Sequence, residues 1–395
     1  MSDTHGVSPE LQNWTELPVW HDLAGQPEAV SQLAMAVKNR DAGVHHAWLF
    51  TGPPGSGRSN LAHAFAAALL CSQGGCGVCK SCRMVASGTH PDITALATER
   101  VVIPIEDIRS LVTNSYLGSS VGNYRVMIIE DADRMQERSS NVLLKALEEP
   151  PRNTIWMLCA PSEADLLPTI RSRVRRVALK VPSVEAVAQL LISRDGIDPK
   201  LALEVAAESQ CHIGMARRLA TSSEARSRRR ETLSSALNMR GISSAMFTAD
   251  QWLDIAKKDA DALTSERDAQ EREELMQTLG LGPAESIPPG LRSEFKQLEE
   301  GQKRRATRSL RDGIDRILVD LLALYRDVLT LQLQANVPLV NNDLVTQITD
   351  LANATPPAQT LEKLESISVT RKRVDSNVRD LIALEALAVV LRRRD

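Results

Sequence analysis

Four of the six cysteines in this 395-residue chain fall within twelve residues, at Cys71, Cys76, Cys79 and Cys82. Four thiolates in a glycine-containing loop are enough to hold one zinc ion tetrahedrally, with no position left open for catalysis. We therefore expect a structural Zn²⁺ site in loop 71–82. An iron–sulfur cluster is a weaker alternative, because the bacterial ferredoxin pattern ends in Cys-x3-Cys-Pro and Arg83 follows Cys82 here. Four free thiols are the remaining alternative.

A second motif, residues 52–59, reads Gly-Pro-Pro-Gly-Ser-Gly-Arg-Ser and fits the phosphate-binding pattern G-x-x-x-x-G-K-[ST], except that arginine replaces lysine. Backbone N–H groups of such a turn bind phosphates, together with the N-terminus of the following helix. Arginine keeps the positive charge, but its longer, planar, forked side chain is not equivalent to lysine. We expect a degenerate site for ATP or ADP with Mg²⁺; an ordinary glycine-rich turn is the alternative. Its expected residues are Gly52, Gly55, Gly57, Arg58 and Ser59.

A third motif is the apolar run of residues 126–129, which ends in Glu130 and Asp131. An apolar strand ending in two acids has the form of a Walker B segment, whose aspartate helps to hold Mg²⁺. The usual order is Asp then Glu, so both carboxylates are shifted here by about an ångström, and such misplacement can cost about 10²-fold in rate. We expect these acids beside the phosphates but little hydrolysis. The alternative is a buried strand followed by an acidic helix start.

These motifs need a scaffold that brings them together. Apolar runs predict strands at residues 47–50, 93–97, 126–129, 154–159 and 174–179. Helical periodicity predicts helices at residues 25–39, 58–70, 105–116 and 133–147. Strands that alternate with helices predict a parallel sheet covered on both faces. After Pro182 the pattern is wholly helical, so the sequence predicts one α/β unit over about residues 20–180 and a helical remainder.

Composition excludes several classes of protein. Lys+Arg number 47 against 50 Asp+Glu, a formal net charge of −3, so no global basic field attracts nucleic acid. Hydrophobic residues make up 43% and charged residues 25%, which is typical of a globular protein and excludes wholesale disorder. The N-terminus is polar and no apolar stretch reaches 18 residues, so we expect a cytoplasmic protein without a secretory signal or membrane partner.

Together these segments resemble the AAA+ clamp-loader subunits of bacterial DNA polymerase III, above all the delta-prime family of actinobacterial type. The resemblance also rests on residues 23–26 (LAGQ), 141–151 (NVLLKALEEPP), 166–173 (LLPTIRSR) and 214–219 (GMARRL). It is dense over about residues 20–222. It is looser in the last third, where residues 377–385 are similar to the last helix of the clamp-loader collar.

The resemblance implies a fold and an assembly. Residues 1–180 are expected to form an α/β AAA+ P-loop module, a parallel sheet covered by helices, with a zinc insertion that carries the four clustered cysteines. Residues 181–224 are expected to form a small helical lid, and residues 225–395 an all-α collar domain for oligomerisation. The implied assembly is a pentameric ring with tau/gamma motor subunits and a delta subunit. As part of the DNA polymerase III holoenzyme, it loads the sliding clamp onto primer–template DNA, using ATP.

The resemblance also implies a division of roles. In this family the tau/gamma motor hydrolyses ATP, whereas the delta-prime subunit is a stator that supplies an arginine finger. Arg58, the reversed acids at 130–131 and Pro161 near the sensor-1 position depart from the motor pattern. We therefore favour a stator with little or no ATPase and no polymerase active site. A degenerate tau/gamma-type ATPase and an unrelated AAA+ remodelling ATPase are the alternatives.

Two arginines acquire expected roles from the resemblance. Arg173 lies in the family's Ser-Arg-Cys motif, which reads Ser-Arg-Val here, and is the expected arginine finger acting in trans. Arg217 fits the sensor-2 arginine of the nucleotide site. The alternative for Arg173 is a pairing with a local carboxylate, and Arg171 is its nearest competitor. The basic residues Arg226, Arg228–Arg230 and Arg392–Arg394 are interpreted as solvated helix faces rather than DNA sites.

Overall fold

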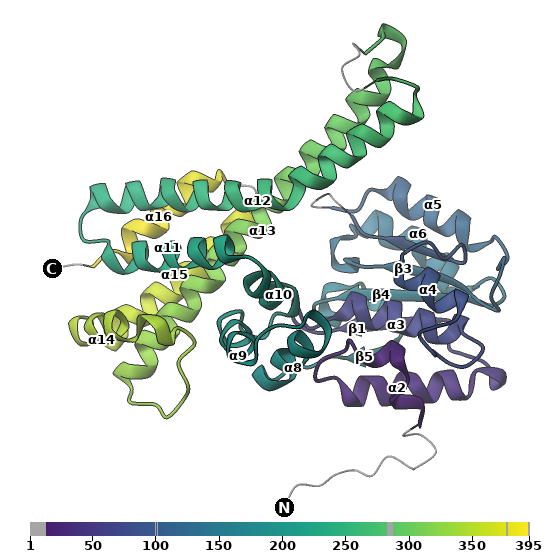
Figure 1. The fold of residues 1–395 in the computed structure, drawn as a ribbon, viewed down its shortest axis with the longest axis horizontal. Coiled ribbons are helices and arrows are strands. Elements are labelled where there is room, and N and C mark those ends of the chain that lie inside the picture. The colour runs from purple at the N-terminus through teal and green to yellow at the C-terminus, as the bar shows by residue number, and fades with distance from the viewer. Residues whose placement is uncertain (1–12, 99, 101, 283–286, 377, 394–395) are drawn as a thin grey trace, which may run out of the picture. The chain divides into compact units, whose positions relative to one another are not determined.

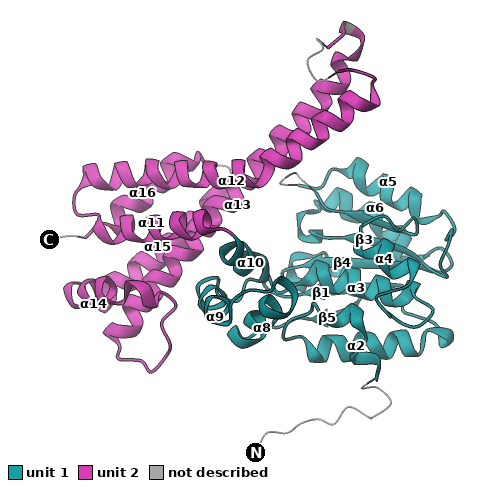
Figure 2. Cartoon of the chain, viewed as in Figure 1, with its two compact units in different colours: residues 1–221 teal, residues 222–395 magenta. Residues whose placement is uncertain are grey.

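The computed structural model describes residues 13–98, 100, 102–282, 287–376 and 378–393. The chain divides into two compact units, Met1–Thr221 and Ser222–Asp395 (Figure 2). Asn377 of the collar-like segment and Arg394 of the C-terminal basic run lie outside the described residues. Each unit has its own apolar core.

A five-stranded sheet forms the centre of the first unit (Figure 1). Its strands are β1 Ala47–Thr51, β2 Ile93–Leu96, β3 Arg125–Ile129, β4 Thr154–Ala160 and β5 Arg175–Ala178. Their order is β2-β3-β4-β1-β5, and every neighbouring pair is parallel. The three inner strands are buried along their whole length, which explains why their sequences are continuous apolar runs.

Helices cover both faces of this sheet. They are α2 Pro27–Lys38, α3 Arg58–Leu70, α4 Lys80–Ala86, α5 Ile105–Ser115, α6 Glu137–Glu148 and α7 Pro168–Arg171. Trp48 and Phe65 belong to the core shared with α2 and α3, whereas Trp156 and Leu143 belong to the core shared with α5 and α6. The helix predicted from residue 133 begins only at Glu137, because a 3-10 turn precedes it. The expected α/β architecture, a parallel sheet covered by helices, is confirmed.

Three short helices complete the first unit: α8 Val184–Asp195, α9 Pro199–Glu208 and α10 Ile213–Thr221. The Ser183 hydroxyl caps α8 by accepting from the backbone N–H of Ala186, and the Asp198 carboxylate caps α9. Gly196 ends α8 in the left-handed conformation (φ +66°), which glycine adopts without a steric penalty. The helical pattern expected after Pro182 is therefore confirmed, while a separate lid function for residues 181–224 stays a prediction.

The second unit is helical throughout its described residues. Its helices are α11 Ser223–Asn238, α12 Ile242–Thr278, α13 Arg292–Gln332, α14 Val345–Ala354, α15 Pro357–Asp375 and α16 Asp380–Leu391. Trp252, Leu318, Tyr325 and Leu384 lie in its apolar core. Short 3-10 turns occur in the connections of both units, at η1 Pro18–Trp20, η2 Arg40–Ala42, η3 Ala132–Arg134, η4 Glu163–Asp165, η5 Pro289–Leu291 and η6 Asn342–Leu344. The expected all-helical remainder is confirmed; its role as a collar stays a prediction.

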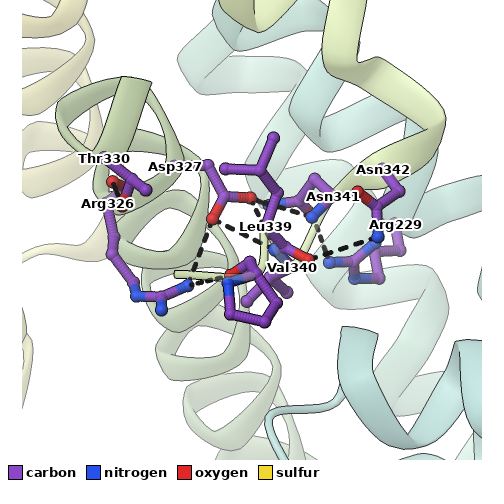
Figure 3. A network of polar contacts seen from close by, with 9 residues as sticks. Arg229, Arg326, Asp327, Thr330, Leu339, Val340, Asn341 and Asn342 are labelled. Carbon is purple, nitrogen blue, oxygen red and sulfur yellow. Dashed lines mark hydrogen bonds and ion pairs between the residues drawn. The ribbon is translucent and has the colours of Figure 1, made fainter. Parts of the chain in front are cut away.

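A buried polar network links α11, α13 and the segment after α13 (Figure 3). Arg229 donates to Asp320 Oδ1 at 3.1 Å and to Asn341 Oδ1 at 2.6 Å. The fully buried Asp327 carboxylate accepts from the backbone N–H groups of Val340 and Asn341 at 3.0 and 2.8 Å. The interpretation of the α11 arginines as a solvated face is therefore wrong for Arg229, which packs inward because Asp320 and Asn341 offer oxygen acceptors inside the unit.

Candidate functional site

The predicted phosphate loop lies between β1 and α3, the strand–turn–helix context that the motif requires. Gly55 and Gly57 have φ angles of +80° and +92°, which side-chain-bearing residues rarely adopt. A Cβ atom on Gly55 would also collide with the ring of His212, which precedes α10. The loop carbonyl of Gly55 accepts from the backbone N–H of Ile213 at 3.2 Å. Glycine at position 55 thus allows α10 to pack directly against the loop.

The loop opens onto a cavity of about 300 Å³ between α3, α8 and α10. Its lining residues are Gly55, Gly57, Arg58, Ser59, Asn60, Arg194, Ile213, Gly214 and Arg217. The structure therefore brings Arg217, expected at the sensor-2 position, to the same cavity as Arg58 and Ser59. It adds Arg194 from the end of α8, which sequence reasoning missed, because no motif spacing relates α8 to the loop.

Two of the cavity arginines share one carboxylate. Asp195 Oδ2 lies 2.8 Å from Arg194 Nη2, and Asp195 Oδ1 lies 3.1 Å from Arg217 Nε. The hydrogen bond from Arg194 and the nearby Arg217 guanidinium hold the pKa of Asp195 below its usual value, although burial opposes the shift. The third arginine, Arg58, folds back over the loop and donates from Nη1 to the carbonyl oxygen of Gly52.

The acids that follow β3 are engaged by cationic or basic side chains of the same unit. Glu130 Oε1 lies 3.2 Å from His63 Nε2, and Asp131 Oδ2 lies 3.9 Å from Arg134 Nε. His63 is on α3, four residues after Ser59, so the two side chains share one face of the helix. That spacing is the sequence signal that would have identified His63. Glu130, the first of the reversed acids, thus lies opposite a histidine that sequence reasoning did not consider.

Cys159 ends up near these acids, at the C-terminal end of β4. Burial raises the pKa of this thiol, and the charge of Glu130 raises it further. The side chain therefore stays a neutral, apolar packing group.

Arg173 lies in the turn between α7 and β5, at the end of the matched segment that was expected to carry an arginine finger. Its Nη2 atom lies 2.6 Å from Glu148 Oε1, and its Nη1 atom donates to the carbonyl oxygen of Thr169 at 2.7 Å. The Arg173 side chain is 34% exposed and that of Glu148 is 48% exposed. In the single chain Arg173 thus has the local carboxylate partner that was the alternative to the finger role. Arg171 is exposed.

The four clustered cysteines converge as expected. Their sulfur atoms all lie within 4.8 Å of one another, with Cys71 at 3.7 Å from Cys76 and 3.8 Å from Cys79. Zn–S bonds of about 2.3 Å in a tetrahedron place sulfur atoms about 3.8 Å apart, so the spacing suits zinc. Although burial opposes it, hydrogen bonds from loop N–H groups lower the pKa of Cys71 to about 6. Burial raises the pKa of Cys82.

The rest of the unit holds this cysteine loop firmly. Arg40 donates to the carbonyl oxygens of Cys71 and Ser72, both at 2.6 Å. Gly74 has a φ angle of +73°, and a Cβ atom there would collide with Trp14. The loop begins where α3 ends, and the 13 residues of α3 span about 20 Å. The cysteine cluster therefore lies about one helix length from the phosphate loop at the other end of α3, which favours a structural metal.

None of the helices in the described ranges combines the length and the apolar character needed to cross a membrane.

Comparisons with known proteins point to one family. Residues 25–183 match the family model described as DNA polymerase III, delta subunit. The chain is 38% identical over 165 residues to the DNA polymerase III delta-prime subunit of Pseudomonas aeruginosa, covering 40% of this chain and 50% of that protein. It is 33% identical over 175 residues to the tau subunit of Escherichia coli, covering 43% of this chain and 27% of that protein. The chain thus spans half the length of the first relative and about a quarter of the second.

Among solved structures, the chain is similar to a DNA polymerase III gamma-subunit-related protein from Thermotoga maritima, with a TM-score of 0.42 and 16% identity. That similarity covers 92% of this chain and 99% of that one.

Proposed function

We propose that this chain, which matches the DNA polymerase III delta-subunit model over residues 25–183 and is similar to a delta-prime subunit, acts as the delta-prime, or stator, subunit of a clamp loader. In this role it joins tau/gamma motor subunits and a delta subunit in a pentameric ring, with the helical second unit as its collar. The ring opens the sliding clamp and places it on primer–template DNA in an ATP-dependent reaction. DNA and clamp contacts are made by the assembled complex.

The phosphate site supports a stator rather than a motor. The chain is similar to both delta-prime and tau relatives, so the comparison does not distinguish a stator from a motor. The residues of the phosphate site have to distinguish the two roles. A motor needs a lysine on the phosphates and a carboxylate that orients the attacking water. Here Arg58 is directed to the carbonyl oxygen of Gly52 and Glu130 lies against His63. Both arrangements disfavour hydrolysis, so the isolated chain is expected to show little or no ATPase activity.

The observation that carries the stator role is the position of Arg173. It occupies an exposed turn at the C-terminal end of the clamp-loader-like segment 166–173, and its partner Glu148 is half exposed. Exposed ion pairs contribute only about 0–1 kcal/mol, so the guanidinium can exchange Glu148 for a neighbour's phosphate at little cost. Arginine binds phosphate oxygens bidentately. A guanidinium supplied in trans accelerates phosphoryl transfer by about 10³–10⁵ in GTPases.

The cysteine cluster supports a structural zinc ion in the same protein. Cys71, Cys76, Cys79 and Cys82 would hold it, and the bound ion would contribute folding free energy to the first unit. Because the cluster lies at the far end of α3 from the phosphate loop, we assign it no part in nucleotide chemistry.

Reconstitution tests the proposed function directly. The motor subunits, the delta subunit, the clamp and primed DNA are combined with and without this chain, and ATPase activity and clamp loading are measured. We expect loading to require the chain, and the chain to co-purify with the motor subunits. Equal loading without it would contradict the stator role. Motor-like ATP turnover by the isolated chain, lost on Arg58→Ala, would favour a degenerate motor. Absence of any association would favour an unrelated AAA+ protein.

A further inference from the structure

The cavity beside the phosphate loop carries more positive charge than the neighbouring acids Asp195 and Asp133 neutralise. Arg58, Arg194 and Arg217 line it, and none of the described residues that line it is acidic. The Asp195 carboxylate contacts two of these arginines from beside the cavity. Asp195 pairs with two of the three guanidinium groups and the charge of Asp133 acts on the third, Arg58, so three positive charges face two negative ones and one positive charge remains in excess. Such a surplus in a concave site favours an anionic ligand.

Backbone and hydroxyl donors add to this preference. The N-cap of α3 is Gly57, which provides no side chain to the first turn, so the N–H groups of that turn remain for a ligand or water. Ser59 lines the cavity and adds a hydroxyl donor from the same turn. Phosphate oxygens satisfy donors of both kinds, and helix N-termini bind them readily.

The same site is poorly arranged for magnesium. Mg²⁺ needs near-octahedral oxygen ligands and is usually held by one or two carboxylates together with substrate phosphates. Glu130 Oε1 instead lies 3.2 Å from His63 Nε2, one helical turn along α3 from Ser59. Asp131 Oδ2 lies 3.9 Å from Arg134 Nε. Basic side chains of the protein therefore compete with the ion for both acids.

We propose that this cavity binds the phosphate chain of a nucleoside polyphosphate without a magnesium ion. The three arginines take the charge-neutralising part that Mg²⁺ has in ordinary phosphate-loop sites, since guanidinium groups bind phosphate oxygens in pairs of parallel hydrogen bonds. A bound phosphate chain bridges Arg58 to Arg194 of α8 and Arg217 of α10; Arg58 uses guanidinium N–H groups other than the Nη1 donor that reaches Gly52. This inference rests on the proposed function only in treating the loop as a nucleotide-type site.

The test is equilibrium binding to the full-length chain, measured by titration calorimetry with ADP in EDTA, with ADP in excess Mg²⁺, and with inorganic pyrophosphate. We expect the affinity for ADP in EDTA to equal or exceed that in Mg²⁺. Pyrophosphate separates recognition of the phosphate chain from recognition of the nucleoside, and we expect it to bind and to compete with ADP. Binding that disappears in EDTA would overturn the proposal, as would no binding of either compound.

Variants locate the effect. Arg194→Gln and Arg217→Gln are each expected to weaken ADP binding about tenfold or more, because each removes charge-assisted hydrogen bonds. The matched control is Arg152→Gln, an exposed arginine outside the cavity, which should bind as the wild type does. His63→Ala should make binding tighter in Mg²⁺ than in EDTA, since the side chain that competes with the ion for Glu130 is removed; an unchanged ratio would overturn the role given to His63. Circular dichroism confirms that each variant is folded.

The outcomes separate this inference from the stator role. Failure to bind ADP or pyrophosphate overturns the inference, while clamp loading that depends on the chain leaves the stator role standing. Conversely, a reconstituted complex that loads clamps without this chain overturns the stator role, whatever the calorimetry shows.

Discussion

Arg173 Nη2 lies 2.6 Å from Glu148 Oε1, and this ion pair joins the end of α6 to the turn before β5. Glu148 belongs to the Glu-Glu-Pro-Pro segment that ends α6, and Arg173 to the segment in which an arginine finger is expected. Both side chains are substantially exposed, so the pair is weak and exchangeable. We infer that Glu148 holds the guanidinium in a defined place until a neighbouring subunit presents a phosphate.

Replacement of Arg173 tests the finger role. Arg173→Ala should cost at most about 1 kcal/mol of stability, because only an exposed ion pair is lost. The reconstituted complex should nevertheless lose ATPase activity and clamp loading, by about tenfold or more, since a finger supplied in trans acts on the transition state. Arg171→Ala is the internal control. An equal loss from that control, or normal loading by an assembled Arg173→Ala complex, would refute the assignment.

Replacement of Glu148 tests the holding interaction. Glu148→Gln removes the charge that attracts Arg173 but keeps the shape of the side chain. We expect ATPase activity of the complex to be unchanged or to rise by about fivefold at most, which corresponds to the free energy of an exposed pair. Steady-state ATPase measurements at saturating clamp and DNA check this. A loss as large as that of Arg173→Ala would mean that the pair itself, not the guanidinium alone, is required.

The metal prediction is tested by composition and stability together. The purified chain should contain about one zinc per molecule, and Cys79→Ser should lose it and be destabilised by about 4 kcal/mol or more. Cys211→Ser, at a half-buried thiol outside the cluster, is the control and should retain its metal. Elemental analysis and urea denaturation are the measurements. Iron in place of zinc, or no metal after gentle purification, would contradict the assignment.

The contacts of Asp195 predict a pH dependence. Because the pKa of this carboxyl is lowered in the folded protein, the stability it contributes is present above the unfolded pKa, near 3.9, and is lost as the pH falls through the folded pKa. At pH 7, Asp195→Asn should cost about 1–3 kcal/mol. Urea denaturation at descending pH should show the advantage of the wild type shrinking. A constant difference between pH 7 and pH 3 would contradict this account.

The buried network around Asp327 predicts a large stability effect remote from the phosphate site. In the wild type the Asp327 carboxylate accepts hydrogen bonds from the backbone N–H groups of Val340 and Asn341. Asp327→Asn replaces this charged acceptor with an amide and should lower the free energy of unfolding by about 3 kcal/mol. Asp343→Asn, at a 37% exposed acid that lies 3.7 Å from Arg230, should change stability by less than about 1 kcal/mol. Equal effects of the two substitutions in thermal unfolding would show that burial does not strengthen the dependence on the Asp327 carboxylate.

Local patterns in the sequence predicted much of this protein. The phosphate loop, the cysteine cluster and the apolar strands each depend on residues that are close in the chain, so their spacing alone predicts turns, ligands and strands. The sequence predicted a helix boundary correctly where the stop signal is local, as at Pro150 after the end of α6. The start of α6 was predicted four residues too early, because a 3-10 turn at residues 132–134 occupies the beginning of the helical pattern.

Only the tertiary structure decided which charges meet. His63 and Glu130 are 67 residues apart in the chain, and neither local sequence predicts contact with the other. Arg194 reaches the phosphate cavity because α8 packs beside the loop, and Arg229 is buried because Asp320 and Asn341 lie opposite it. A charged residue has the same identity whether it is solvated or paired. Its burial, partner and pKa depend on distant segments that the fold brings within a few ångströms, and these contacts appear only once the chain has packed.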